Sequence, residues 1–128
     1  MCFNVMIDNR RDNPRQHQLI SYTQNGGWRL TPAQNLIPGY RGRKPDAQYP
    51  MELGDAGRLV SVENLLSQHA RFQLTATDAR IIIETMGLII SSTWRPICQA
   101  QGLGDSDCAA IASAMAEPLD ELNQVRAA

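Results

Sequence analysis

The sequence is short of cysteine, of aromatic residues and of long apolar runs. Its 128 residues include three cysteines, Cys2, Cys98 and Cys108, and no CxxC pair. A disulfide framework and a zinc site are therefore not indicated, and a reducing cytoplasm is the expected compartment. No apolar run approaches the ~18 residues of a transmembrane helix, and the N-terminal segment becomes charged too soon for a signal peptide. We therefore expect a cytoplasmic protein without a membrane segment.

Lysine is also nearly absent, because eleven of the twelve basic residues are arginine. Residues 1–44 hold seven basic and two acidic side chains, a net charge of +5, whereas residues 45–128 hold five basic and eleven acidic ones, a net charge of −6. A basic segment is typical of contact with nucleic acid, phosphate or an acidic partner. Aromatic residues do not interleave with these arginines as a stacking platform would need, so attraction between the two ends of one domain is the simpler interpretation. Nonspecific nucleic-acid binding is the alternative, through Arg10, Arg11, Arg15, Arg41, Arg43 and Lys44.

The first half of the chain predicts one small hairpin between irregular segments. Residues 1–7 are apolar and resemble the last turns of an element. Residues 17–23 and 28–31 predict two strands, because Asn25-Gly26-Gly27 between them is a strong turn signal. The proline- and glycine-rich residues that follow predict a long irregular connection, with at most a brief strand at 51–53.

The second half predicts helices. Ser61 and Thr75 are expected N-caps, and Pro96 is expected to end or bend the helix that starts at Thr75. In chain order, the expected helices cover residues 60–70, 76–94, 105–116 and 119–125. With 43% hydrophobic residues the chain can form a real core, so we expect one domain of the mainly α (α+β) class.

The helix expected at 76–94 is apolar on most sides. One face follows the spacing i, i+3, i+4, i+7 and i+11, through Ala79, Ile82, Ile83, Met86 and Ile90. Ile81, Leu88 and Ile89 widen this face nearly all the way round. The pattern predicts a central helix that is buried on most of its circumference.

Two motifs give the chain a family resemblance. Residues 3–7 (FNVMI) are followed by Asn9 and Arg15, and residues 28–33 (WRLTPA) follow the hairpin. This order resembles the catalytic region of the HipA-type serine/threonine kinases, the toxin half of bacterial toxin–antitoxin modules. Their pattern is approximately F-N-x-L-I-G-N-x-D-[DG]-H-x-[KR]-N, a hairpin, then W-R-L-[ST]-P-x-Y-D-L. Residues 72–75, the isoleucine-rich helix and Trp94 resemble the family's helical C-terminal lobe.

The resemblance implies a single kinase-like C-terminal lobe over residues 1–128, with the hairpin at its N-terminal end. Its parts are a catalytic loop and hairpin (1–35), an irregular loop (36–58) and a helical bundle (59–128). No segment matches the family's N-terminal half, which covers ATP. The apolar residues ahead of the loop, Phe3, Val5 and Ile7, are therefore expected to be exposed and to promote self-association or binding of a second protein.

The catalytic residues of the family do not carry over. The position of the proton-accepting aspartate is Arg11, the histidine position is Asn13, the magnesium-binding asparagine is Gln16, and the Tyr-Asp pair is Gln34-Asn35. An arginine, with a pKa above about 12, accepts no proton near neutral pH. Neutral amides are poor substitutes for carboxylates on magnesium. We therefore predict no catalytic, cofactor-binding or metal-binding residue at these positions.

Two carboxylates outside the pattern are candidates in a shifted register. Asp8 lies five residues before Asn13, the kinase spacing of base and metal-binding asparagine, and Asp12 lies one position beyond the substituted aspartate. The alternative is that both are solvated loop carboxylates, with Asp8 paired to Arg10 or Arg11. His17 is expected to be a strand-end imidazole and not a metal ligand, because no second histidine is nearby.

These observations predict a catalytically degenerate kinase-like lobe that acts by binding protein or as a regulatory module. The expectation leans against an enzyme and includes no cofactor. The alternative is the C-terminal half of a split serine/threonine kinase, which a separate ATP-binding chain would complete. In that case Mg-ATP would be the cofactor, and Asp8 or Asp12 would serve as the base.

Overall fold

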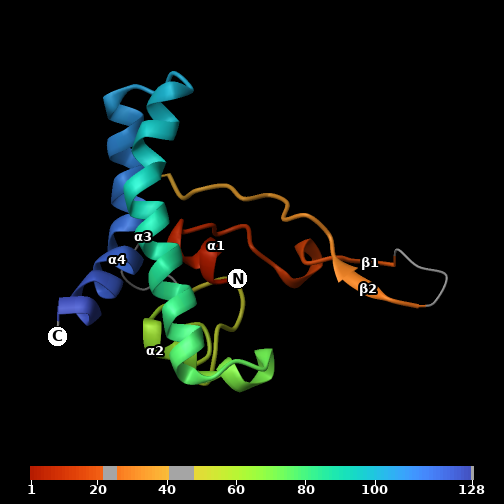
Figure 1. The fold of residues 1–128 in the computed structure, drawn as a ribbon. Helices are drawn as coiled ribbons and strands as arrows, with labels where there is room; N and C mark the ends of the chain where they lie inside the picture. Colours follow the sequence, from red (N-terminus) through yellow and green to blue (C-terminus); the bar gives the residue numbers. More distant parts are fainter. Residues whose placement is uncertain (22–25, 41–47, 128) are drawn as a thin grey trace.

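The computed structural model describes residues 1–21, 26–40 and 48–127, and the side chains among them except those of 116–119 and 121–127. Figure 1 shows a helical body from which a two-stranded hairpin projects to one side. This is the mainly helical α+β class that the sequence predicts. The elements, in chain order, are α1 (Cys2–Met6), the 3-10 turn η1 (Pro14–Gln16), β1 (Leu19–Ser21), β2 (Trp28–Leu30), α2 (Val62–Ser67), the 3-10 turn η2 (His69–Phe72), α3 (Ala76–Ala100) and α4 (Asp105–Ala127).

The core forms where α3 packs against α1, α2 and α4. The helix α3 starts at Thr75, whose hydroxyl oxygen accepts a hydrogen bond from the backbone N–H of Asp78, so the predicted cap is confirmed. Ser61 caps α2 in the same way. One face of α3 is buried in a cluster of residues from all these elements: Val5, Met6, Ile7, Tyr49, Leu53, Val62, Leu65, Leu66, Ala79, Ile83, Ile90, Ile111 and Met115.

The N-terminal apolar residues belong to this core. Val5 is 2% exposed and Ile7 is 5% exposed, and Phe3 is half-buried against the cluster. The expectation that they form an exposed apolar patch is therefore wrong. The physical reason is that α1 packs on α3 and α4 of the same chain, which covers its apolar side chains without a second protein.

Both long helices run further than predicted. The helix α3 continues through Pro96 to Ala100, although proline has no N–H to donate to the preceding turn. Trp94 and Cys98 pack against the core on either side of Pro96, and this packing holds the helix together. The break expected between residues 116 and 119 is also absent, because α4 is one helix from Asp105 to Ala127. A helix already formed gains one hydrogen bond for each residue that it adds.

The other side of α3 is exposed, so the prediction that this helix is buried on most sides is wrong. Ile81, Ile82, Leu88 and Ile89 are 55%, 45%, 51% and 55% exposed. We call these four residues the outer stripe of α3. The described elements are too few to surround the helix: in Figure 1, α4 runs along one side of α3, α1 lies on the other side, and α2 lies near its start.

The hairpin pairs β1 with β2 in antiparallel register, with Leu19 opposite Leu30 and Ser21 opposite Trp28. The two predicted strands are confirmed, although the first begins at Leu19 and the second ends at Leu30, and residues 22–23 of the first prediction lie outside the described residues. Asn25 of the predicted turn lies outside the described residues. Every residue of both strands is exposed, and the hairpin contributes nothing to the core. The brief strand expected at 51–53 does not form. The next residues contain an isolated β-bridge between Gly54 and Gly57.

The segment 48–59 is ordered by Asn64, a buried residue of α2. Its side-chain oxygen accepts from the N–H of Ala56 at 2.8 Å, and its amide donates to the carbonyls of Gly57 at 3.1 Å and Leu59 at 2.7 Å. Gly54 lies so close that an added Cβ would be 2.0 Å from the carbonyl oxygen of Asn64.

Among the described residues, no helix combines the length and apolar character that crossing a membrane requires.

Candidate functional site

The polar loop (residues 8–17) leaves α1 through a residue in the left-handed conformation. Asp8 has a φ of 51°, and its carboxylate is 2.5 Å from Nε of Arg10. The guanidinium of Arg10 also donates to the carbonyl of Gln48 at 2.9 Å. The predicted pairing of Asp8 with Arg10 is confirmed. Asp8 is only 6% exposed, however, so it is not a solvated carboxylate.

Asn9 joins α1 to the segment that follows the hairpin. Its amide donates to the side-chain oxygen of Asn4 at 3.1 Å and to the carbonyl of Asn35 at 2.8 Å. Its own side-chain oxygen accepts from the backbone N–H of Arg11 at 3.1 Å. Asn4 and Asn9 are two of the residues that carry the resemblance to the HipA-type motif, and both are buried. In this structure they fix the path of the loop.

Asp12 is the most deeply placed carboxylate of the loop, with 1% exposure. One of its oxygens is 2.9 Å from Nε2 of His17, and the other accepts from the hydroxyl of Tyr49 at 3.1 Å. Both oxygens are therefore engaged by side chains of the same chain. The expectation of a solvated loop carboxylate is wrong, and His17, the predicted strand-end imidazole, is a partner of this buried acid.

Tyr49 is the second side chain that holds Asp12 in this network. Its ring is 1% exposed, and its hydroxyl also lies 3.2 Å from the carbonyl of Asn9. Burial, and then the negative charge of Asp12, raise the pKa of Tyr49 well above its usual value. The hydroxyl therefore stays protonated and donates, and since it has one proton the carboxylate of Asp12 is its stronger acceptor.

The four substituted motif positions do not meet in one site. Arg11 is exposed, and the side-chain oxygen of Asn13 caps η1 by accepting from the N–H of Arg15 at 3.0 Å. Asn35 is exposed, with a φ of 55°, and contributes its carbonyl to Asn9. Of the positions compared with the HipA-type pattern, Gln16 and Gln34 line one pocket. The Oε1 of Gln16 is buried and has no hydrogen-bond partner among the described residues.

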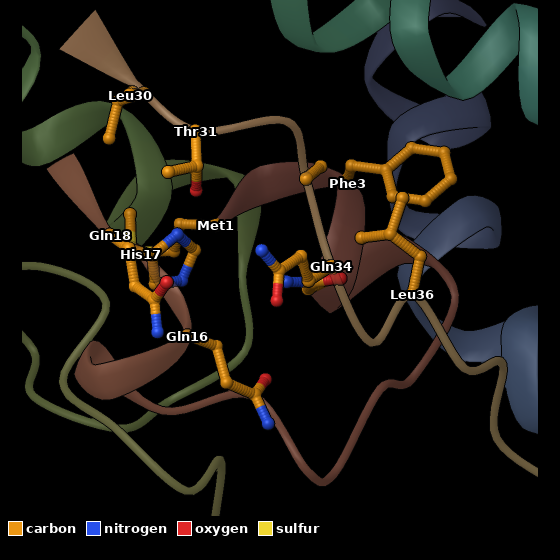
Figure 2. A pocket seen from close by; sticks show the side chains of 11 residues that line it. Met1, Phe3, Gln16, His17, Gln18, Leu30, Thr31, Gln34 and Leu36 are labelled. Atoms are coloured by element: carbon orange, nitrogen blue, oxygen red, sulfur yellow. The ribbon is translucent and has the colours of Figure 1, made fainter. Parts of the chain in front are cut away.

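This pocket of about 260 Å³ lies between the start of α1, the polar loop and the segment after β2 (Figure 2). Figure 2 shows the side chains of Gln16, His17 and Gln34 around it. Its lining has no acidic and no arginine or lysine side chain, and consists of Met1, Phe3, Asn4, Gln16, His17, Gln18, Leu30, Thr31, Ala33, Gln34 and Leu36. Such a lining exchanges hydrogen bonds with a polar group but offers no carboxylate to take a proton from a hydroxyl.

No group of three or more histidine, cysteine, aspartate and glutamate side chains suited to hold a metal ion occurs among the described residues. Asp8 and Asp12, the two carboxylates of the loop, are each held by a different cation or hydroxyl of the same chain. They do not face the pocket together, and neither is among its lining residues.

Sequence reasoning missed Tyr49, which belongs to this network, and Asn64, which orders the adjoining segment 48–59. Tyr49 lies in a proline- and glycine-rich stretch that predicts an irregular loop, and its spacing from Asp12 gives no local signal. Asn64 lies within a predicted helix, where an asparagine is ordinarily solvated. The proline- and glycine-rich stretch holds two aromatic residues, Tyr40 and Tyr49, and only Tyr49 is buried, so its aromatic character alone did not identify it.

Comparisons with known proteins leave the family open. No family model, no curated protein and no solved structure matches this chain. The likeness to HipA-type kinases therefore depends on the motif residues at 3–7, 9, 15 and 28–33.

Proposed function

We propose that this chain is a catalytically degenerate kinase-like lobe that acts by binding another protein. The observation that carries the proposal is the state of Asp12, the carboxylate nearest to the lost catalytic position. A general base must reach the proton that it accepts, at about 2.6–3.2 Å. Asp12 is 1% exposed, and both of its oxygens already accept hydrogen bonds from the chain.

The other candidate base is no better placed for proton transfer. Asp8 is 6% exposed, and its Oδ1 is 2.5 Å from Nε of Arg10, so the guanidinium already occupies this oxygen. Arg11, at the family's catalytic position, adds a positive charge where magnesium would have to bind. These residues give little support to the alternative, in which a separate ATP-binding chain completes a split kinase.

The hairpin supplies the argument for a protein partner. A two-stranded hairpin on its own is marginally stable in water. Here it carries apolar side chains far outside the core, with Leu19 60%, Trp28 66% and Leu30 68% exposed. Among the described residues, each of the two strands also has an edge that pairs with no further strand. A polypeptide that covers these side chains, or adds a strand to an edge, would remove both sources of instability.

The catalytic half of the proposal is tested by titrating the purified chain with Mg-ATP in an isothermal calorimeter. We expect no binding tighter than about millimolar, because the lining of the pocket has no carboxylate to hold magnesium and no arginine or lysine side chain to hold phosphate. Micromolar binding that is lost in the Gln16→Ala variant would instead support the split kinase.

The binding half is tested with a photoreactive amino acid at Leu19 or Trp28 in cells that produce the chain. We expect both positions to cross-link the same discrete polypeptide, because both lie on the hairpin. The matched control has the photoreactive residue at Ser113, an exposed position on α4. Equal cross-linking from Ser113, or different products from Leu19 and Trp28, would contradict a docking role for the hairpin.

A further inference from the structure

The outer stripe of α3 is a second apolar surface, separate from the hairpin. Its members Ile81, Ile82, Leu88 and Ile89 recur at i, i+1, i+7 and i+8, and 45–55% of each residue is exposed. At 100° per residue these positions form a band about 120° wide on the side of α3 opposite the core. Thr85 lies at the middle of the band, so its apolar residues are distributed evenly on both sides of this threonine.

The charges at the two ends of the stripe are opposite. Asp78 is in the first turn of α3 and Arg95 is in the last part of the helix, and both are exposed. By the helical period, each lies within a quarter-turn of the middle of the stripe. The midpoint between them falls between residues 86 and 87, less than two residues from Thr85. The stripe thus has an acidic end and a basic end, and the midpoint between these two charges nearly coincides with the middle of the stripe at Thr85.

We propose that the outer stripe binds the same stripe of a second copy of this chain, with the two α3 helices antiparallel. A two-fold axis at Thr85 sets Ile81 opposite Ile89 of the second copy and Ile82 opposite Leu88 of the second copy. It also brings Asp78 near Arg95 at both ends of the pair. This is an isologous contact, in which one self-complementary surface is used twice. Parallel packing would instead set like charges together at both ends.

The remaining charge near the axis is already compensated. Glu84 lies beside the stripe close to Thr85, so the two copies would bring two glutamates near each other. Arg80, one helical turn earlier, is 4.0 Å from the carboxylate of Glu84 on the same helix. Each glutamate therefore meets the axis together with its own arginine, which reduces their mutual repulsion.

The pair should be weak, because one helix face per copy buries less than the standard interface of roughly 800 Å² per partner. We expect a dissociation constant on the order of tens of micromolar. The inference goes beyond the proposed function, since it needs no other protein and uses a surface that the hairpin does not share. It is measured on the purified chain alone, so its failure leaves the hairpin experiment unaffected.

The first test is sedimentation velocity of the full chain from roughly 5 to 500 µM, a range that spans the expected dissociation constant. We expect the wild type to shift from monomer to dimer and Leu88→Glu to remain monomeric. Leu19→Glu is the matched control, because Leu19 is equally apolar and exposed but lies on the hairpin. A strictly monomeric wild type, or loss of the dimer in Leu19→Glu and not in Leu88→Glu, would overturn the proposal.

The second test distinguishes antiparallel from other arrangements by exchanging the end charges. Arg95→Glu alone makes both ends acidic and Asp78→Arg alone makes both ends basic, so each should weaken the dimer about tenfold. In an equimolar mixture of the two variants, each end of a mixed pair has one acidic and one basic side chain, so the mixture should associate as the wild type does. Circular dichroism verifies that Asp78→Arg, which loses a capping contact with Thr75, remains helical. Two folded variants whose mixture stays monomeric would refute the antiparallel register.

Discussion

Replacing Asp12 distinguishes a structural carboxylate from a catalytic one. In Asp12→Ala the hydroxyl of Tyr49 and the imidazole of His17 both lose their acceptor. A hydrogen bond to a charged group contributes about 1.5–3 kcal/mol. The His17 side chain is 37% exposed, so water replaces most of its share, and Tyr49 retains the carbonyl of Asn9 at 3.2 Å. The expected loss is about 2–4 kcal/mol out of a typical stability of about 5–15 kcal/mol.

The measurement is urea unfolding at pH 7, followed by circular dichroism at 222 nm. Asp12→Asn keeps the size and one acceptor oxygen, and should lose about half as much stability as Asp12→Ala. Glu52→Ala is the control, because this carboxylate is exposed in the adjoining segment and should change stability by less than about 0.5 kcal/mol.

A double-mutant cycle tests whether Tyr49 is the partner that matters. If the two side chains act together, Asp12→Ala and Tyr49→Phe should be non-additive by about 0.5 kcal/mol or more. A carboxylate kept for catalysis behaves differently, since its removal leaves stability unchanged or raises it. A change below about 0.5 kcal/mol in Asp12→Ala would therefore refute the structural role of Asp12 and reopen the split-kinase alternative.

Three further predictions follow from burial and close contacts. Because the pKa of Tyr49 is raised, the unfolded chain loses the hydroxyl proton near the ordinary pKa of 10.0 while the folded chain keeps it. The contribution of Tyr49 to the free energy of unfolding should therefore be constant below pH 10 and fall above it by up to about 1.4 kcal/mol per pH unit. In urea titrations between about pH 9 and 11, Tyr49→Phe should remove this part of the slope. Gly54→Ala should lower the free energy of unfolding by more than about 2 kcal/mol, because the added Cβ would lie 2.0 Å from the carbonyl oxygen of Asn64. Gly104→Ala is the control and should be nearly neutral, because no atom lies within 4 Å of its added Cβ. Equal melting temperatures of the two variants would contradict the close approach at Gly54. Ile83→Ala should lower the free energy of unfolding by about 2–5 kcal/mol and Ile82→Ala by less than about 1 kcal/mol, because Ile83 is 3% exposed and Ile82 is 45% exposed. The reverse order in chemical unfolding would contradict the assignment of the buried and exposed faces of α3.

The local signals in the sequence determined where most elements begin and which class they form. Ser61 and Thr75 are N-caps in the structure because a capping hydroxyl acts within three residues and needs no distant partner. The two strands pair as predicted for the same reason, since short hairpins depend on neighbouring residues. The residues at positions 11, 13, 16 and 35 count as substitutions only relative to the pattern of the HipA-type kinases, a likeness that the comparisons leave open.

Only the tertiary structure decided which of the apolar and charged residues are buried. Ile82 and Ile83 are neighbours of the same chemistry, but α1, α2 and α4 cover one of them and leave the other to solvent. Asp12 is buried because Tyr49 and His17 reach it, and Tyr49, at a sequence separation of 37, gives no local sign of that contact. Periodicity fixes the angle of a side chain on its helix, whereas burial depends on which other element arrives at that angle.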